Sequence, residues 1–165
     1  MQHVHLPKVI FPIILIFTDT VKFIFIFTLL LIFLWFYGYG IGLHYLALPA
    51  VLITQLLLTT ALVFFLAAIV PFLPDLRYVV ENLLMAVFFM SGIFLASESV
   101  PEAYRGYYYL NPMVNLIESY RNILMFHEWP SFTALLIISS LSLVGIGLAI
   151  RLIARFEYVY PKIMR

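Results

Sequence analysis

The sequence predicts an all-α integral membrane protein with about four membrane helices, the third short or broken, plus one external amphipathic helix. Of its 165 residues, 65% are hydrophobic and only 10% are charged, and the mean hydropathy is +1.10. Soluble domains are about 45–50% apolar and about 25% charged, so both values depart in the direction of lipid. Helices are expected rather than strands, because lipid cannot hydrogen-bond unpaired backbone groups and the sequence has no strand-length polar alternation.

The positions of charges and turn-forming residues divide the apolar part of the chain into four stretches. Glycines separate the first two stretches between Gly38 and Gly42, and Pro71 follows the second. A hydrocarbon core of about 30 Å needs about 20 helical residues, so the third stretch, with about fifteen, is marginal. Gly92 within it favours a broken helix, which is tolerated only against protein or water. The predicted spans are Ile13–Tyr37, Leu46–Val70, Leu83–Ser97 and Phe132–Ile150.

The distribution of Lys and Arg predicts the orientation of these spans. With both termini in the cytoplasm, six of the nine basic residues lie inside, as the positive-inside rule requires. These six are Lys8, Arg77, Arg151, Arg155, Lys162 and Arg165. Asp19 and Lys22 lie near the start of the first span and are expected to form an interfacial pair rather than a buried relay.

The segment 98–131 is too apolar for a simple loop and predicts an amphipathic helix. Asn111 is a good N-cap, and Pro112 is favoured at the first helical position. Glu118 and Arg121 are three residues apart and are expected to pair. This helix either lies on the outer membrane surface or dips back between the spans, and both alternatives stay open. Its apolar face is predicted to hold Met113, Leu116, Ile117, Tyr120 and Leu124.

A cluster of tyrosines precedes that helix, and two roles fit it equally well. Tyrosine rings anchor proteins at the membrane interface, and they also pack on the C–H faces of sugars while their hydroxyls form hydrogen bonds. The cluster consists of Tyr104, Tyr107, Tyr108 and Tyr109.

Four sequence motifs, in this order, carry a resemblance to a known family. They are LPKVIFP at 6–12, PDLRY at 74–78, VPE with LNPM and IESYR between 100 and 121, and a basic tail with RFE at 155–157. The chain resembles the permease subunit of type-2 ABC exporters, in particular the branch that exports polysaccharides such as O-antigen, capsule and teichoic acid. The resemblance covers essentially the whole chain but only the rear part of the family's fold. The family's N-terminal amphipathic helix and first two spans are therefore expected to be missing.

The resemblance implies a role for three parts of this single transmembrane domain, 1–165. Residues 1–12 would be a cytoplasmic coupling segment, with Leu6, Lys8, Phe11 and Pro12 against a nucleotide-binding ATPase subunit. Asp75 and Arg77 would lie in a cytoplasmic loop. Residues 98–131 would be an external gate-like segment, and the expected gate or substrate-path residues are Tyr104, Tyr107, Tyr108, Tyr109, Asn111, Pro112, Glu118 and Arg121.

The same resemblance implies the partners and the location. The chain would be a multi-pass subunit of the bacterial inner membrane that exports a lipid-linked polysaccharide. ATP and Mg would be bound by the ATPase, with no cofactor on this chain and no nucleic acid as a partner. A second permease copy, as a homodimer, or a chain supplying the missing spans would complete the transporter. Without those spans and the ATPase, no export is expected.

Other classes of function are weighed against this one. The sequence has no cysteine, no Gly-rich phosphate loop, and no third ligand for His3 and His5, so an enzyme and a metal site are not expected. A truncated remnant or accessory membrane protein without transport activity is one alternative. A type-2 ABC permease for another substrate, such as a drug or a lipid, is the other.

Overall fold

The computed structural model describes residues 10–73, 75–93 and 101–156, and their regular structure is helical throughout. Three helical stretches are long and apolar enough to cross a membrane, namely Ile10–Phe36, Leu43–Ile69 and Phe132–Arg155. The prediction of an all-α integral membrane protein is confirmed. In chain order the elements are α1 (Ile10–Phe36), the 3₁₀ turn η1 (Leu43–Ala47), α2 (Leu48–Ile69), α3 (Leu76–Phe89), α4 (Glu102–Tyr108), α5 (Pro112–Arg121), the π-helical turn η3 (Asn122–Phe126) and α6 (Phe132–Phe156).

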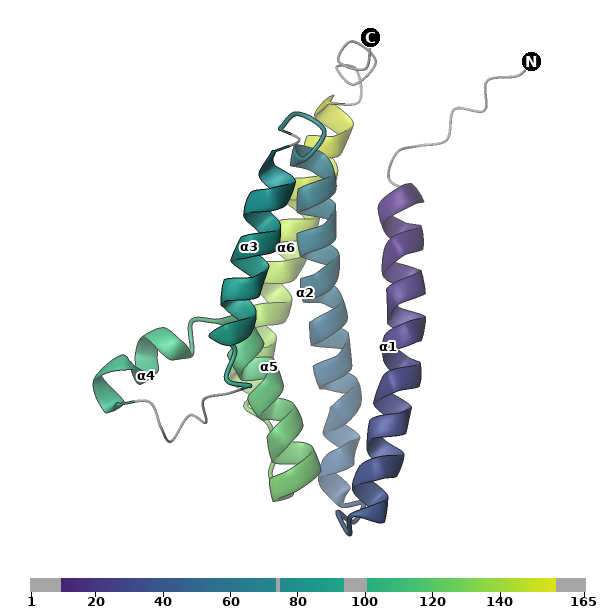
Figure 1. The fold of residues 1–165 in the computed structure, drawn as a ribbon, viewed down its shortest axis with the longest axis vertical. Helices are drawn as coiled ribbons and strands as arrows, with labels where there is room; N and C mark the ends of the chain where they lie inside the picture. The colour runs from purple at the N-terminus through teal and green to yellow at the C-terminus, as the bar shows by residue number, and fades with distance from the viewer. Residues whose placement is uncertain (1–9, 74, 94–100, 157–165) are drawn as a thin grey trace, which may run out of the picture.

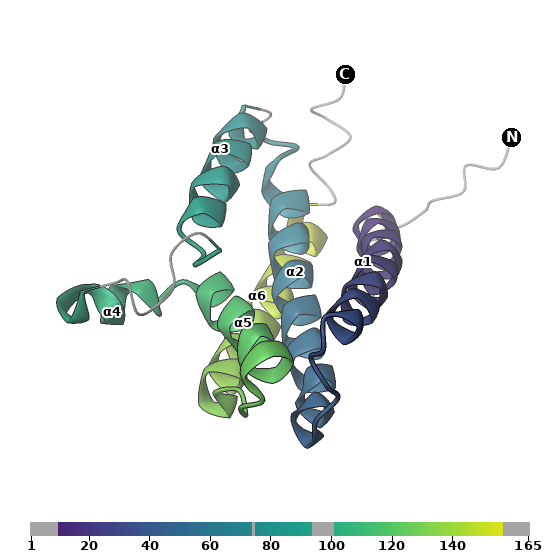
Figure 2. The same ribbon diagram turned by 60° about the horizontal axis from the view of Figure 1, so that its bottom comes forward.

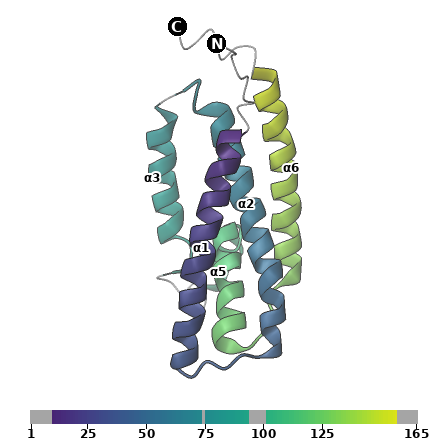
Figure 3. The same ribbon diagram turned by 90° about the vertical axis from the view of Figure 1, so that its right-hand side faces the viewer.

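The helices run up and down along one axis (Figures 1 and 3). The start of α1, the connection from α2 to α3 and the end of α6 lie at one end, which we call the terminal end. The turn between α1 and α2 lies at the opposite end, which we call the hairpin end. The first and last described helices therefore begin and end on the same side of the bundle.

Two short helices, α3 and α5, together cover the length of the bundle once, and we call this pair the third crossing. α3 leaves the terminal end but stops part of the way along the bundle, and α5 continues to the hairpin end (Figure 3). With 14 residues, α3 is about 21 Å long, short of the about 30 Å of a hydrocarbon core. The chain changes direction after it, where Gly92 adopts a φ of +82° in the left-handed region. The prediction of a short or broken third helix is confirmed.

The predicted limits of that third helix were wrong. The sequence predicted Leu83–Ser97, whereas the helix is Leu76–Phe89, and residues 94–97 lie outside the described part of the chain. The helix starts earlier because the charges that suggested a loop pair with each other. Arg77 donates to Glu81 four residues later over 3.1 Å, a spacing that stabilises a helix. It ends earlier because the left-handed Gly92 prevents its continuation.

The centre of the bundle is the pair α2 and α6, which pack side by side and run parallel, both toward the terminal end (Figure 1). Gly145 approaches α2 so closely that an added Cβ would lie 3.6 Å from the Cβ of Ala61, and small residues allow such close packing between membrane helices. The hydroxyls of Thr54 and Ser139 share a hydrogen bond of 3.0 Å across the same interface. Val51 on α2, with Ile123 and Leu135 from η3 and α6, forms the core at the hairpin half.

α1 packs on this core over only part of its length. Its residues Phe27, Leu31 and Leu34 contact the core cluster of the hairpin half, whereas Pro12 is its one buried residue. Figure 1 shows α1 and α2 converging toward the hairpin end and separating toward the terminal end. Two grooves lie between α1 and its neighbours, as described below.

Candidate functional site

The start of α5 is fixed by a cap within the expected gate segment. Asn111 has an extended backbone, and its side-chain oxygen accepts a hydrogen bond from the Met113 N–H at 3.0 Å. Pro112 is the first helical residue, where its missing N–H costs nothing. The predicted helix start is confirmed. The helical path then continues through η3 to Phe126, and the chain reverses at His127, whose φ of +57° is left-handed.

One face of α5 lines a groove that we call the apolar groove. All five residues predicted for the apolar face border it, together with residues of α1 and α2, and its volume is about 450 Å³. Leu116 and Leu124 are buried in the core. The Tyr120 hydroxyl donates to the Gln55 side-chain oxygen over 2.7 Å, which joins α5 to α2. α5 is thus packed among the spans rather than lying apart from them.

The opposite face of α5 lines a hollow with a different chemistry, which we call the polar hollow. Its volume is about 440 Å³, and each described residue that lines it has a polar side chain: Tyr109, Asn115, Glu118, Ser119, Asn122 and Ser131. The Asn115 amide donates to the carbonyls of Tyr109 and Asn111, at 2.8 and 3.2 Å. These bonds hold the chain before α5 against the helix.

The expected pairing of Glu118 with Arg121 was wrong. No ion pair joins them among the described residues, because each has a nearer partner elsewhere. Glu118 accepts a hydrogen bond of 3.1 Å from the Tyr109 hydroxyl, and Arg121 donates to the Ile93 carbonyl over 3.3 Å. Asn111 donates to the Met90 carbonyl at 3.5 Å. Asn111 and Arg121, at the two ends of α5, therefore hold the turn that follows α3.

The four tyrosines do not form one surface. α4 projects sideways from the bundle (Figures 1 and 2), and Tyr104 and Tyr107 are exposed on it. Tyr108 packs edge-on against Tyr109, with ring centroids 5.7 Å apart. Burial and the Glu118 carboxylate raise the pKa of the Tyr108 phenol, whereas Arg121 lowers it, so the phenol stays neutral at neutral pH. Only Tyr109 of the four lines the polar hollow.

The residues expected at the ATPase interface are described in part. Leu6 and Lys8 lie outside the described residues, while Phe11 and Pro12 form part of the first turn of α1. Phe11 is exposed and Pro12 is buried. Asp75 occupies the N-cap position of α3, where its side chain makes no capping bond. The start of α1 and the start of α3 both lie at the terminal end (Figure 3).

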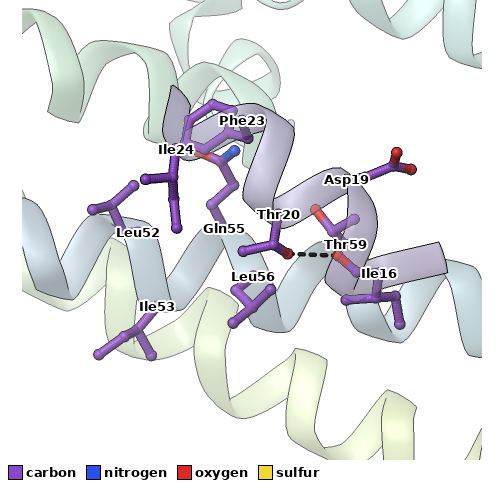
Figure 4. Close-up of a pocket in the computed structure, with 10 residues that line it drawn as sticks. All are labelled: Ile16, Asp19, Thr20, Phe23, Ile24, Leu52, Ile53, Gln55, Leu56 and Thr59. Carbon is purple, nitrogen blue, oxygen red and sulfur yellow. Dashed lines mark hydrogen bonds between the residues drawn. The ribbon is translucent and has the colours of Figure 1, made fainter. Parts of the chain in front are cut away.

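A second groove between α1 and α2 was not anticipated from the sequence (Figure 4). Its volume is about 410 Å³, and its lining is mostly aliphatic, with Gln55 and Thr59 as polar residues that also border the apolar groove. Asp19 lies at one edge and forms the expected exposed pair with Lys22, 3.1 Å apart. The signal that could have found this groove is Gln55 itself, because polar side chains within spans face the bundle.

Metal-binding side chains are not grouped in the described part of the chain. No cluster of three or more His, Cys, Asp or Glu residues occurs there.

The candidate site is α5, with the apolar groove on one face and the polar hollow on the other.

Comparisons with known proteins place the chain in a family. Residues 4–125 match the ABC-2 type transporter family. Over 146 residues, which are 87% of this chain and 56% of the relative, the sequence is 32% identical to the O-antigen export system permease protein RfbA of Myxococcus xanthus. The chain thus spans about half the length of that curated relative. No solved structure matches. With its apolar helices and this match over most of its length, the chain belongs to the ABC-2 type transporter family.

Proposed function

We propose that this protein is the membrane-spanning subunit of an ABC exporter that moves a lipid-linked polysaccharide across the bacterial inner membrane. The observation that carries the proposal is the 32% identity, over 87% of the chain, to an O-antigen export permease. The sequence has no Gly-rich phosphate loop, so a separate ATPase subunit binds ATP and Mg and supplies the energy.

The terminal end is the cytoplasmic end in this proposal. Arg77, Arg151 and Arg155 belong to the terminal ends of α3 and α6, and basic residues concentrate on the cytoplasmic side of membrane proteins. The segment 1–12 contacts the ATPase through Leu6, Lys8, Phe11 and Pro12. Asp75 and Arg77 lie next to that contact.

The gate in this proposal is α5 with the polar groups around it. Asn111 and Pro112 set the start of the helix, Glu118 orients Tyr109, and Arg121 holds the end of α3. Tyr104, Tyr107 and Tyr108 lie on or beside the projecting α4 and line the exit for the glycan. The complete transporter contains a second permease copy, or a chain that carries the part of the relative's length that this chain does not match.

Co-expression with the ATPase tests the coupling. Because the sequence has no cysteine, Lys8→Cys gives a single reactive thiol, and a crosslink to the ATPase in membranes is expected. The matched control is Gly40→Cys at the hairpin end, which should give no crosslink. Labelling of Lys8→Cys from outside in intact cells would contradict both the contact and the orientation.

Export itself is tested in a strain that lacks its own O-antigen permease. The chain, its ATPase and the chain that completes the transporter should together restore polymer at the cell surface, and the chain alone should not. Restoration by the chain and ATPase alone would contradict the need for a further chain. A complete, ATP-hydrolysing complex that moves a drug or lipid but no glycan would favour the alternative substrate class. An absence of any transport would favour an accessory or remnant role.

A further inference from the structure

The polar hollow adjoins an apolar one that the proposed function does not use. This second hollow, which we call the apolar hollow, has a volume of about 420 Å³ and lies between α2, α6 and the start of α5. Tyr109 and Asn115 line both hollows, so the two adjoin at these residues. Leu58, Ile138 and Leu141 provide much of the apolar wall. A hydroxyl-rich space and a hydrocarbon-lined space therefore share one boundary on the same side of α5.

The groups in the polar hollow are held in position and keep free hydrogen-bonding capacity. Tyr109 donates to one oxygen of the Glu118 carboxylate, and the second oxygen is free to accept. The Asn115 amide donates to two carbonyls, which leaves its side-chain oxygen as an acceptor. The Asn122 side chain makes no hydrogen bond to another described residue, so its donor and acceptor are both available. A ligand that fits must both donate and accept hydrogen bonds over a short distance.

The charge in the hollow restricts the class of ligand further. Glu118 is the one charged residue among the described residues that line it. No cation among the described lining residues would balance a phosphate headgroup beside this carboxylate, because Arg121 borders the apolar groove instead, so an anionic phospholipid is disfavoured. Neutral sugar hydroxyls donate to carboxylates and amides and accept from amides, and the Tyr109 ring offers an apolar face for sugar C–H groups. The apolar hollow beside it suits a hydrocarbon chain.

We propose that the two hollows form one glycolipid-binding site, with a neutral sugar in the polar hollow and its lipid chain in the apolar hollow. Glu118, Asn115 and Asn122 bind the sugar hydroxyls, and Tyr109 packs between the sugar and the chain. The inference rests on the proposed function, because a lipid-linked glycan is such an amphiphile. It adds a location to that function: the first sugar next to the lipid is bound between α5 and α6.

Binding is tested with the full chain in lipid nanodiscs and three probes of related structure. Radiolabelled dodecyl-β-maltoside, below its micelle concentration, carries both a sugar and a chain. Dodecylphosphocholine carries the same chain with a zwitterionic headgroup that has no hydroxyl groups, and maltose carries the sugar alone. Saturable binding of dodecyl-β-maltoside is expected, with weak competition from the other two, because dodecylphosphocholine has no sugar hydroxyls and maltose has no chain.

Substitutions separate the two hollows. Glu118→Leu should weaken binding about tenfold, since it removes a charged acceptor of hydroxyl hydrogen bonds. Ile137→Trp, at an exposed position of the apolar hollow, should weaken it by blocking the chain. Asn82→Leu on α3, away from both hollows, is the matched control and should change affinity less than twofold. If Glu118→Leu fails to fold, Asn122→Ala is the polar-hollow variant to test in its place, because the Asn122 side chain makes no hydrogen bond to another described residue.

The result that overturns the inference is equal binding of dodecylphosphocholine and dodecyl-β-maltoside, or unchanged affinity in the folded polar-hollow variants. Absence of binding with intact export would refute this site and leave the proposed function standing. Sugar-dependent binding without export in any complete complex would support the site and refute the proposed function.

Discussion

At the scale of residues, a few polar side chains determine how α5 sits in an otherwise apolar bundle. Asn111 caps the helix, and Tyr120 joins it to Gln55 on α2. Tyr120 and Gln55 would both lose a hydrogen-bond partner if α5 moved away from α2. Unpaired polar groups are costly in a low-dielectric environment, so these hydrogen bonds fix the position of α5 and also stabilise the protein.

Removing the cap should destabilise the protein measurably. Asn111→Ala leaves the Met113 N–H without its side-chain acceptor, and loss of an N-cap typically costs about 1 kcal/mol. Unfolding by SDS in mixed micelles measures the change in the free energy of unfolding. Asn82→Ala is the control, because its exposed side chain caps no helix terminus. Equal stability of the two variants would refute the role of the cap.

The Tyr120–Gln55 hydrogen bond should appear as a coupling energy. In a double-mutant cycle of Tyr120→Phe and Gln55→Leu, we expect about 0.6 kcal/mol and at most about 1.7 kcal/mol, the range found for side-chain hydrogen bonds in membrane proteins. A cycle of Gln55→Leu with Tyr45→Phe should give no coupling, since no hydrogen bond joins that pair. A coupling of zero in both cycles would show that the bond contributes nothing to stability.

At the scale of elements, α3 is held by hydrogen bonds only at the end that leads into the Gly92 turn, among the residues that the structure describes. None of the residues of α3 is buried, whereas Met90 and Ile93 in the turn after it accept hydrogen bonds from Asn111 and Arg121. The packing of α3 therefore depends on the turn that follows it. Changes in that turn, or in α5, should act on the whole third crossing.

The left-handed residue at this turn gives a direct test. Gly92→Ala places a side chain at a φ of +82°, and left-handed backbone costs L-residues roughly 1–2 kcal/mol. The free energy of unfolding should fall by that amount in the SDS assay. Gly147→Ala has open space around the new Cβ within α6 and should be neutral or stabilising by up to about 1 kcal/mol. A stabilising Gly92→Ala would contradict the turn.

Arg121 should matter more for export than for membrane insertion. Arg121→Ala removes the donor to the Ile93 carbonyl, so the end of α3 separates from α5 and export in the complete transporter should fall several-fold. Glu118→Gln weakens the acceptor for Tyr109 and should lower export less. Surface polymer and membrane protein level are measured together, and Arg151→Ala is the control. Unchanged export in both variants would make α5 a passive helix.

At the scale of the whole molecule, both described ends lie on one side of the bundle (Figure 1). An even number of crossings follows, with α3 and α5 acting together as one of them. In the orientation that we propose, the terminal end carries the coupling segment and the hairpin end faces outward. This orientation is the framework on which the gate and coupling assignments depend.

Single cysteines test that orientation on a background without native thiols. Gly40→Cys, where the hairpin has open space, should react with a membrane-impermeant maleimide in spheroplasts. Arg155→Cys, at the end of α6, should react only after the membrane is permeabilised. The reverse pattern would place the terminal end outside and refute the orientation.

The sequence predicts those parts of the fold that depend on local signals. The Asn111-Pro112 start of α5 and its apolar face follow from capping and helical spacing, and both are confirmed. The partners of Glu118 and Arg121 could not be predicted, because they depend on where the chain before α5 and the end of α3 lie in space. The early start of α3 was missed because Arg77 and Glu81 have the composition of a loop yet pair along a helix.

The candidate site was predictable in the same way, by segment rather than by contact. The sequence marks 98–131 as important, but it does not separate Tyr109, which lines the polar hollow, from Tyr104 and Tyr107, which are exposed. Asn115 and Asn122 were passed over because an amide on the polar side of an amphipathic helix has no distinctive pattern. The coupling segment stays a prediction.

The hydrogen bond between Thr54 and Ser139 has a consequence for how the protein is made. The two residues are 85 positions apart, so at about 5–20 residues per second the ribosome completes the second about 4–17 s after the first. In that interval the Thr54 hydroxyl also bonds the Ala50 carbonyl of its own helix, at 2.8 Å, which spares it an unpaired state in lipid. α1 and α2 therefore enter the membrane as a helical hairpin before α6 has been synthesised. A nascent chain arrested before residue 132 is an inserted but unpacked intermediate, open to the proteases that clear unassembled membrane proteins.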